Sequence, residues 1–167
     1  MTGWHLRPAE AADVPGIAAI YGHHVAEGFA SFEEVPPEPA DMARRREALI
    51  AGGFPYLVAV DAAGALLGYA YAGPYRPRSA YRFTVEDSIY VAPAAAGRGI
   101  GRALLGRLIE ECRARGYRQI VAVIGDSANL PSINLHRALG FEPAGLLRHV
   151  GLKKGRWLDS VLMQLSL

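Results

Sequence analysis

The spacing of apolar residues along the chain predicts alternating strands and helices. Residues 83–91 are rich in β-branched and aromatic side chains, which is typical of a strand, and Pro93 closes the run. From Ile100 to Cys112 apolar residues recur every three or four positions with charged residues between them. This spacing predicts a helix with one buried stripe, which Gly116 ends.

Similar patterns predict the other elements. Strands are expected at 5–8, 56–60, 66–72, 119–124, 146–150 and 157–165, and helices at 13–28, 41–51 and 131–139. The run 119–124 is almost continuously apolar, which favours a strand buried on both faces. The order predicts a mixed α/β fold with one layered sheet, and residues 1–167 are expected to form a single domain.

Composition narrows the possible partners. The chain has 167 residues, of which 51% are hydrophobic and 20% charged, and its formal net charge is +2. This charge is too small to require nucleic acid, and no apolar run is long enough to cross a bilayer. Residues 1–7 lack the apolar core of a signal peptide, so we expect a cytoplasmic protein without a membrane partner. The single cysteine, Cys112, lies on the apolar helix stripe and is expected to be a buried hydrophobe.

A glycine-rich segment joins the 83–91 strand to the following helix. Gly97, Gly99 and Gly101 let bare backbone approach a ligand where the first helical turn leaves N–H groups unpaired. Arg98 and Arg102 add positive charge, so a phosphate or pyrophosphate is the expected guest. A tight structural turn is the alternative. The spacing excludes both a P-loop and a dinucleotide-binding fingerprint.

The connection before that strand is rich in arginine. Arg76, Arg78 and Arg82 alternate with Tyr75 and Tyr81. Guanidinium groups suit a carboxylate or a phosphate, so this segment is a candidate substrate lip. A solvated basic loop is the alternative interpretation.

Several separated motifs together resemble the GCN5-related N-acetyltransferases (GNAT). They are Val91, the loop 99–101 that opens a helix, Asn129 after the next strand, and the Leu135-His136 pair followed by Gly140-Phe141. Residues 71–75, 84–91, 121–124 and 155–159 are most similar to the phosphinothricin and methionine sulfoximine acetyltransferases of that superfamily. The resemblance covers nearly the whole chain in element order.

The resemblance implies a fold and a set of partners. It implies one mixed, mostly antiparallel sheet of six to seven strands, flanked by about four helices. It also implies acetyl-CoA as the co-substrate, a small amino-acid-like acceptor and a homodimer. No metal is implied, and no metal-ligand spacing is present in the sequence.

The same resemblance assigns the cofactor residues. Pantetheine would lie along the strand and against Asn129, and the pyrophosphate would lie on the glycine-rich loop. The full set is Ile89, Tyr90, Val91, Ala96, Gly97, Arg98, Gly99, Ile100, Gly101, Arg102 and Asn129. Ala96 departs from the family, which usually has Gln or Arg there, and Arg98 would replace the lost charge.

Acetyl transfer to an amine needs a proton acceptor, because an ammonium group cannot attack a thioester. On a regular strand Glu86 lies on the polar face with Thr84, Ser88 and Tyr90, while Asp87 points to the apolar face. Glu86 is therefore the expected base, as in the amino-acid-directed subgroup. A strand bulge, which the family has, would change this alternation. The alternative role for Glu86 is a salt bridge to Arg82 or Arg76.

The remaining roles also follow from the resemblance. The backbone N–H of Val91 would stabilise the oxyanion, and His136 would protonate the CoA thiolate or orient a water; a structural role for His136 is the alternative. The acceptor's carboxylate would bind an arginine of the lip. The expected substrate set is Phe32, Tyr75, Arg76, Arg78, Tyr81, Arg82, Val85 and Glu86.

These observations lead to one hypothesis and two alternatives. The hypothesis is an acetyl-CoA-dependent N-acetyltransferase that acts on the α-amine of a small amino acid or analogue, such as phosphinothricin, methionine sulfoximine or methionine sulfone. The first alternative acceptor is a protein N-terminus, a lysine or a polyamine. The second alternative is a non-catalytic protein that senses acyl-CoA.

Overall fold

The computed structural model describes residues 3–167, and Met1 and Thr2 of the expected single domain lie outside the described residues. Its strands are β1 (Trp4–Pro8), β2 (Tyr56–Asp61), β3 (Leu66–Pro74), β4 (Thr84–Val91), β5 (Gln119–Gly125), β6 (Glu142–Lys153) and β7 (Arg156–Ser166). Its α-helices are α1 (Val14–Glu27), α2 (Pro39–Ala51), α3 (Ile100–Ala114) and α4 (Leu130–Ala138). The element order predicted from the sequence is confirmed.

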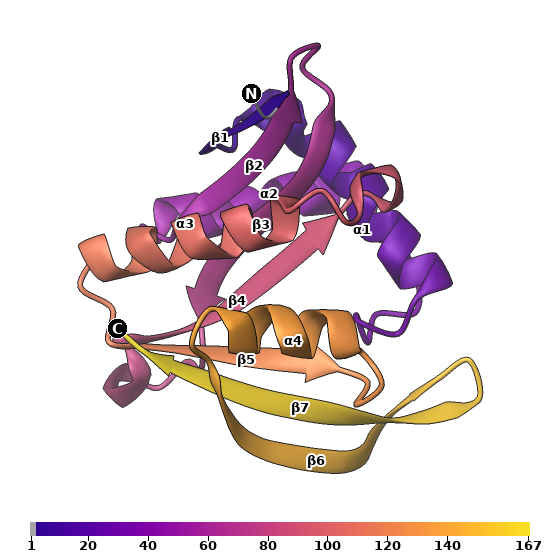
Figure 1. Ribbon diagram of the computed structural model, residues 1–167, viewed down its shortest axis with the longest axis vertical. Helices are drawn as coiled ribbons and strands as arrows, with labels where there is room; N and C mark the ends of the chain where they lie inside the picture. The colour runs from indigo at the N-terminus through magenta and orange to yellow at the C-terminus, as the bar shows by residue number, and fades with distance from the viewer. Residues whose placement is uncertain (1–2) are drawn as a thin grey trace.

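The strands form a single seven-stranded sheet in the order β1-β2-β3-β4-β5-β7-β6. All neighbouring pairs are antiparallel except β4 and β5. Helices α1 and α2 cover one face, and α3 and α4 cover the other (Figure 1). This arrangement confirms the mixed, mostly antiparallel sheet flanked by helices.

The two faces of the sheet hold two hydrophobic clusters. The stripe of α3 packs against Val85 and Ile120, and Cys112 lies in this cluster with no exposed surface, as its place on the stripe predicted. On the opposite face, α1 packs on Tyr56, Tyr69 and neighbouring side chains. Removing this apolar surface from water is the main stabilising contribution, and it fixes both helices that flank β4.

Two details of the strands differ from the sequence expectations. The strand predicted at 146–150 is present but longer than expected, because β6 runs from Glu142 to Lys153. Pro143 and Gly145 hid its beginning, but β6 is an edge strand, and its pairing with β7 shifts register between these two residues, where a proline is tolerated. The bulge that the family resemblance implied for β4 is absent from its pairing with β3, which runs in unbroken register from Val85 to Val91.

Candidate active site

A cleft opens where the two parallel strands separate. Pairing of β4 with β5 covers only residues 84–87 and 119–122, and the strands then diverge (Figure 1). The space between them has a volume of about 450 Å³. Its walls are residues 87–91 of β4, residues 122–125 of β5, and side chains of α1 and α4. The sheet therefore has a gap at its centre that packing leaves accessible.

The backbone of β4 faces this cleft with unpaired groups. The N–H of Ala92 bonds the Leu67 carbonyl of β3, so by alternation the peptide groups of Tyr90 also face β3, whereas those of Ile89 and Val91 face the side where β5 has left. His24 of α1 donates from Nε2 to the Val91 carbonyl at 2.8 Å. The Val91 N–H thus points into the cleft.

The glycine-rich segment ends next to this cleft. Gly97 and Gly99 both have φ of +77°, a left-handed conformation that favours glycine. The first helical bond of α3 is from the Ala103 N–H to the Gly99 carbonyl, and within the described chain the N–H groups of residues 97–102 have no backbone acceptor. This row of amides at a helix N-terminus is able to hold an anion.

The structure brings most of the expected cofactor residues together. Ile89, Tyr90, Val91, Ala96 and Asn129 line the cleft. The side chain of Ile100 is buried in the core, so only its backbone faces the loop. Gly97, Arg98, Gly99, Gly101 and Arg102 form the turn at its rim, and both arginines are exposed. Asn129 also caps α4, because its Oδ1 accepts the Ser132 N–H at 3.3 Å.

Glu86 lies in a second, smaller pocket of about 390 Å³ on the α2 face of the sheet. Ser88 lines both this pocket and the cleft, so the two spaces meet at that residue. Burial raises the pKa of Glu86, the neighbouring Asp87 raises it further, and Arg76 opposes the shift. Among the described residues Glu86 has no ion-pair partner, so the expected alternative of a salt bridge to Arg82 or Arg76 is not formed.

The other expected substrate residues do not gather around Glu86. The arginine-rich connection lies beyond Pro74, which is the last residue of β3 and lines the Glu86 pocket. On it, the Arg76 guanidinium lies 5.1 Å from the Tyr75 ring, and the rings of Tyr75 and Tyr81 are 5.6 Å apart. The three arginines of the lip have no acidic partner among residues 3–167.

Val85 and Phe32 occupy other places. Val85 is fully buried and belongs to the α3 face, so its side chain points away from the Glu86 pocket. Phe32 packs beside two glycines: a Cβ at Gly151 would lie 2.5 Å from its ring, and one at Gly125 would lie 3.0 Å from it. Gly125 lines the cleft, so Phe32 covers the end of β5.

A comparison with protein-family models matches residues 19–141 to the acetyltransferase (GNAT) family. The chain belongs to this family. It is therefore a GNAT N-acetyltransferase, and the cleft between β4 and β5 is its candidate active site.

Known proteins share this GNAT chain's sequence and shape. A phosphinothricin N-acetyltransferase of Alcaligenes faecalis is 57% identical, over 91% of this chain and 77% of its own. An L-methionine sulfoximine/L-methionine sulfone acetyltransferase of Pseudomonas paraeruginosa is 48% identical, over 97% of this chain and 94% of its own. A phosphinothricin acetyltransferase from Sinorhizobium meliloti, solved with AcCoA, has a TM-score of 0.96 and 53% identity and covers 100% of this chain and 89% of that one.

A buried charged pair closes the bottom of the GNAT cleft. Nε2 of His136 lies 2.8 Å from Oδ2 of Asp87, and its Nδ1 lies 2.8 Å from the Ser132 carbonyl. A carbonyl and a carboxylate are both acceptors, so the ring is doubly protonated; burial lowers the pKa of His136, but the bond to Asp87 prevails and the pKa is raised. Oδ1 of Asp87 is buried without a partner and belongs to a residue that lines the cleft.

Sequence patterns missed several residues of the two pockets. Asp87 breaks the apolar face of its strand, and that break is the sequence signal for a buried partner such as His136. Arg45 and Tyr71 line the Glu86 pocket. No motif surrounds Arg45, and Tyr71 belongs to the motif 71–75 but was not expected at the site. Within residues 3–167, every helix is too short or too polar to cross a bilayer. Across the same range no three His, Cys, Asp or Glu side chains gather as a metal site would.

Asn in place of Asp87 should destabilise the fold in a pH-dependent way. The folded pKa of His136 is raised, so the pair contributes fully below the unfolded value of about 6.5, and the contribution is lost as pH rises through the folded pKa. We expect Asp87→Asn to lower the free energy of unfolding by about 3–5 kcal/mol at about pH 5.5. The loss should become smaller as the pH rises through the folded pKa of His136. Urea unfolding across pH, with NMR titration of His136, measures this. Glu110→Gln, which removes an exposed pair with Arg113, is the control. An equal loss at every pH would contradict the assignment.

Proposed function

We propose that this GNAT enzyme transfers the acetyl group of acetyl-CoA to the α-amine of a small amino acid or analogue, with phosphinothricin and methionine sulfoximine or sulfone as candidate acceptors. The observation that carries the proposal is the position of Glu86, a half-buried carboxylate without an ion-pair partner in the described chain, in a pocket that meets the cleft at Ser88. The names of the relatives support the choice of acceptor.

In this proposal acetyl-CoA enters from the glycine-rich loop. The amides of residues 97–102 hold the pyrophosphate with Arg98 and Arg102, and pantetheine pairs with the peptide groups of Ile89 and with the Val91 N–H, since the Val91 carbonyl already accepts from His24. The thioester carbonyl then lies at the Val91 N–H, which stabilises the oxyanion. The reacting carbon then lies in the cleft, whose lining shares Ser88 with the Glu86 pocket.

The acceptor enters from the other pocket. Its ammonium group gives a proton to Glu86, whose raised pKa suits a base that works near neutral pH. Its carboxylate is attracted by Arg76, Arg78 and Arg82, which carry three positive charges without acidic partners in the described chain. These charges would repel a polyamine, so we favour an anionic acceptor over that alternative.

Proton donation to the thiolate by His136 stays a prediction. Both ring nitrogens are already bonded, so His136 releases a proton only if it breaks the contact with Asp87 or with Ser132. The cytoplasmic location also stays a prediction from the sequence.

Glu86→Gln tests the proposed base. We expect kcat/KM for the acceptor to fall about 10²–10⁴-fold while acetyl-CoA still stabilises the protein against heat, because the amide cannot take up a proton. Release of free CoA thiol, measured with a panel of amino acids, reports the reaction. Glu110→Gln, at an exposed residue of α3, is the control. A variant with the wild-type rate would disprove the base, and wild-type protein that binds acetyl-CoA but releases no thiol with any amine would favour an acyl-CoA sensor.

Arg98→Ala tests the pyrophosphate site. Removal of one exposed positive charge should raise the KM for acetyl-CoA about fivefold, which corresponds to ~1 kcal/mol, and the effect should shrink at high salt. Ala96→Arg should lower the same KM, because it restores the charge that the family usually has. Arg113→Ala, at the far end of α3, should leave it unchanged. An Arg98→Ala variant with the wild-type KM at low salt would mean that the backbone amides alone bind the diphosphate.

We also propose that the enzyme is a homodimer that buries the edge strand β6. Four apolar side chains of β6 and Trp157 of β7 are 46–62% exposed: Leu146, Leu147, Val150, Leu152 and Trp157. An exposed apolar edge strand is normally covered by a partner. Light scattering should give about twice the 17.9 kDa of one chain, and Leu147→Lys should give monomers of unchanged fold. A monomeric wild type would refute this assembly.

A further inference from the structure

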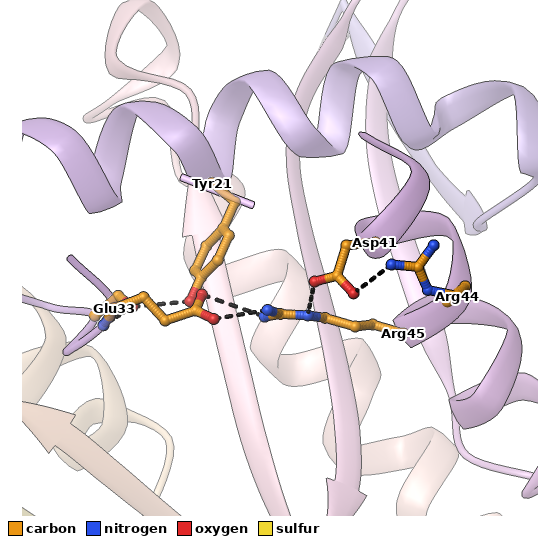
Figure 2. Close-up of polar contacts among 6 residues, drawn as sticks. Tyr21, Glu33, Asp41, Arg44 and Arg45 are labelled. Atoms are coloured by element: carbon orange, nitrogen blue, oxygen red, sulfur yellow. Dashed lines mark hydrogen bonds and ion pairs between the residues drawn. The ribbon is translucent and has the colours of Figure 1, made fainter. Parts of the chain in front are cut away.

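Arg45 of α2 is bonded to acidic side chains through all three of its guanidinium nitrogens. Its Nη2 and Nη1 donate to the two carboxylate oxygens of Glu33 at 2.7 and 3.2 Å, and its Nε donates to Oδ2 of Asp41 at 2.8 Å (Figure 2). Glu33 belongs to the connection between α1 and α2, whereas Asp41 lies one helical turn before Arg45. The guanidinium is thus neutralised by two carboxylates.

The same arginine lines the pocket that contains Glu86. Tyr71 lines the same pocket; burial is the largest cause of the raised pKa of its hydroxyl, the charges of Glu86 and Glu33 add to the rise, and Arg45 opposes it. Glu86 itself has no ion-pair partner within residues 3–167. A cation and a free carboxylate therefore line one small pocket without pairing.

The separation of Arg45 from Glu86 matters if Glu86 acts as a base. An arginine within a few ångströms of a carboxylate lowers the carboxylate pKa by about 1–3 units and occupies the oxygens that would take the proton. The charged or titratable groups near Glu86 come from several elements: Arg45 of α2 and Tyr71 of β3 line its pocket, Arg76 of the lip and Asp87 of β4 act on its pKa, and its charge acts on Tyr90 of β4. Glu33 of the α1–α2 connection enters through its bonds to Arg45. Arg76 already opposes the rise in the pKa of Glu86, and a second free arginine would oppose it in the same direction.

We propose that Glu33 is a positioning residue that holds Arg45 away from Glu86 and so keeps the base free for the acceptor amine. The inference rests on the proposed function in that it takes Glu86 as the base. Its central claim, that Arg45 pairs with Glu86 when Glu33 is removed, is testable without any acceptor.

Glu33 suits this role better than Asp41. Its two oxygens match the guanidinium fork, whereas Asp41 reaches only Nε of Arg45 and is shared with Arg44. The segment before Glu33 is also fixed: the Tyr21 hydroxyl is 2.8 Å from Ser31 Oγ, and the buried Lys153 donates to the Ser31 carbonyl at 2.7 Å. The side chains of Glu33 and Arg45 are 35% and 44% exposed, so their pair contributes little to stability and its loss should not unfold the protein.

The test compares Glu33→Gln, Arg45→Gln and the double variant. Two measurements are made: the pKa of Glu86, by NMR of the carboxyl carbon assigned with Glu86→Gln, and the acidic limb of the pH profile of kcat/KM. Pairing with Arg45 favours the ionised carboxylate, so Glu33→Gln should lower the pKa of Glu86 by about one unit or more and reduce kcat/KM about tenfold. The double variant should match Arg45→Gln alone in both measurements, because no cation remains to capture the base.

Two further variants separate positioning from general disruption. Glu33→Asp keeps a carboxylate and should retain most of the wild-type pKa of Glu86. Glu111→Gln breaks a similar cluster on α3, in which one carboxylate bonds Arg107 and Arg115, and should change neither measurement.

An unchanged pKa of Glu86 in Glu33→Gln would overturn the inference, as would a loss of activity that Arg45→Gln does not relieve. If the wild type acetylates no amine, the proposed function fails on that result alone, while the NMR comparison still decides which carboxylate Arg45 pairs with.

Discussion

The one parallel contact in the sheet ends after four residue pairs, and the chemistry of the molecule depends on where it ends. A continuous sheet would satisfy the peptide groups of Ile89 and Val91 with β5. Because β5 turns away to pair with β7 alone, the peptide groups of Ile89 and the N–H of Val91 have no strand partner in the described chain, while the Val91 carbonyl accepts from His24. Buried peptide groups without a partner are costly, so this edge of β4 favours a ligand that can bond to it. The sheet thus leaves room for an extended segment between β4 and β5. This space lies beside the N-terminus of α3, whose first amides have no backbone acceptor in the described chain.

Near this space, some charged side chains form ion pairs and others do not. His136 and Asp87 neutralise each other at the closed end, and Arg45 is neutralised by Glu33 and Asp41 on the α2 face. Glu86 on one side, and the arginines of the lip on the other, are left without opposite charges in the described chain. In the function proposed above, an α-amino acid would place its ammonium group at Glu86 and its carboxylate at the arginines of the lip.

Much of this architecture was predictable because it depends on local patterns. The apolar stripe of α3, the alternation that places Glu86 opposite Asp87, and the left-handed glycines of the loop are all encoded within a few neighbouring residues. The contacts that complete the site join distant segments. Asp87 meets a histidine 49 positions later, and His24 reaches the carbonyl of Val91 across 67 positions. No periodicity records such pairs, and the full length of β6 likewise depends on its place at the sheet edge, where Pro143 is tolerated.

The connection after α1 crosses β5 closely at Gly125, and this contact restricts which residues the position can accept. A Cβ there would lie 2.5 Å from the Ala30 carbonyl oxygen and 2.8 Å from that of Phe29, so the connection after α1 rests directly on the end of β5. Any bulkier residue at 125 must lift that connection, and Glu33 would move with it. Under the role proposed above for Glu33, remodelling this end of the cleft would therefore also alter the surroundings of Glu86.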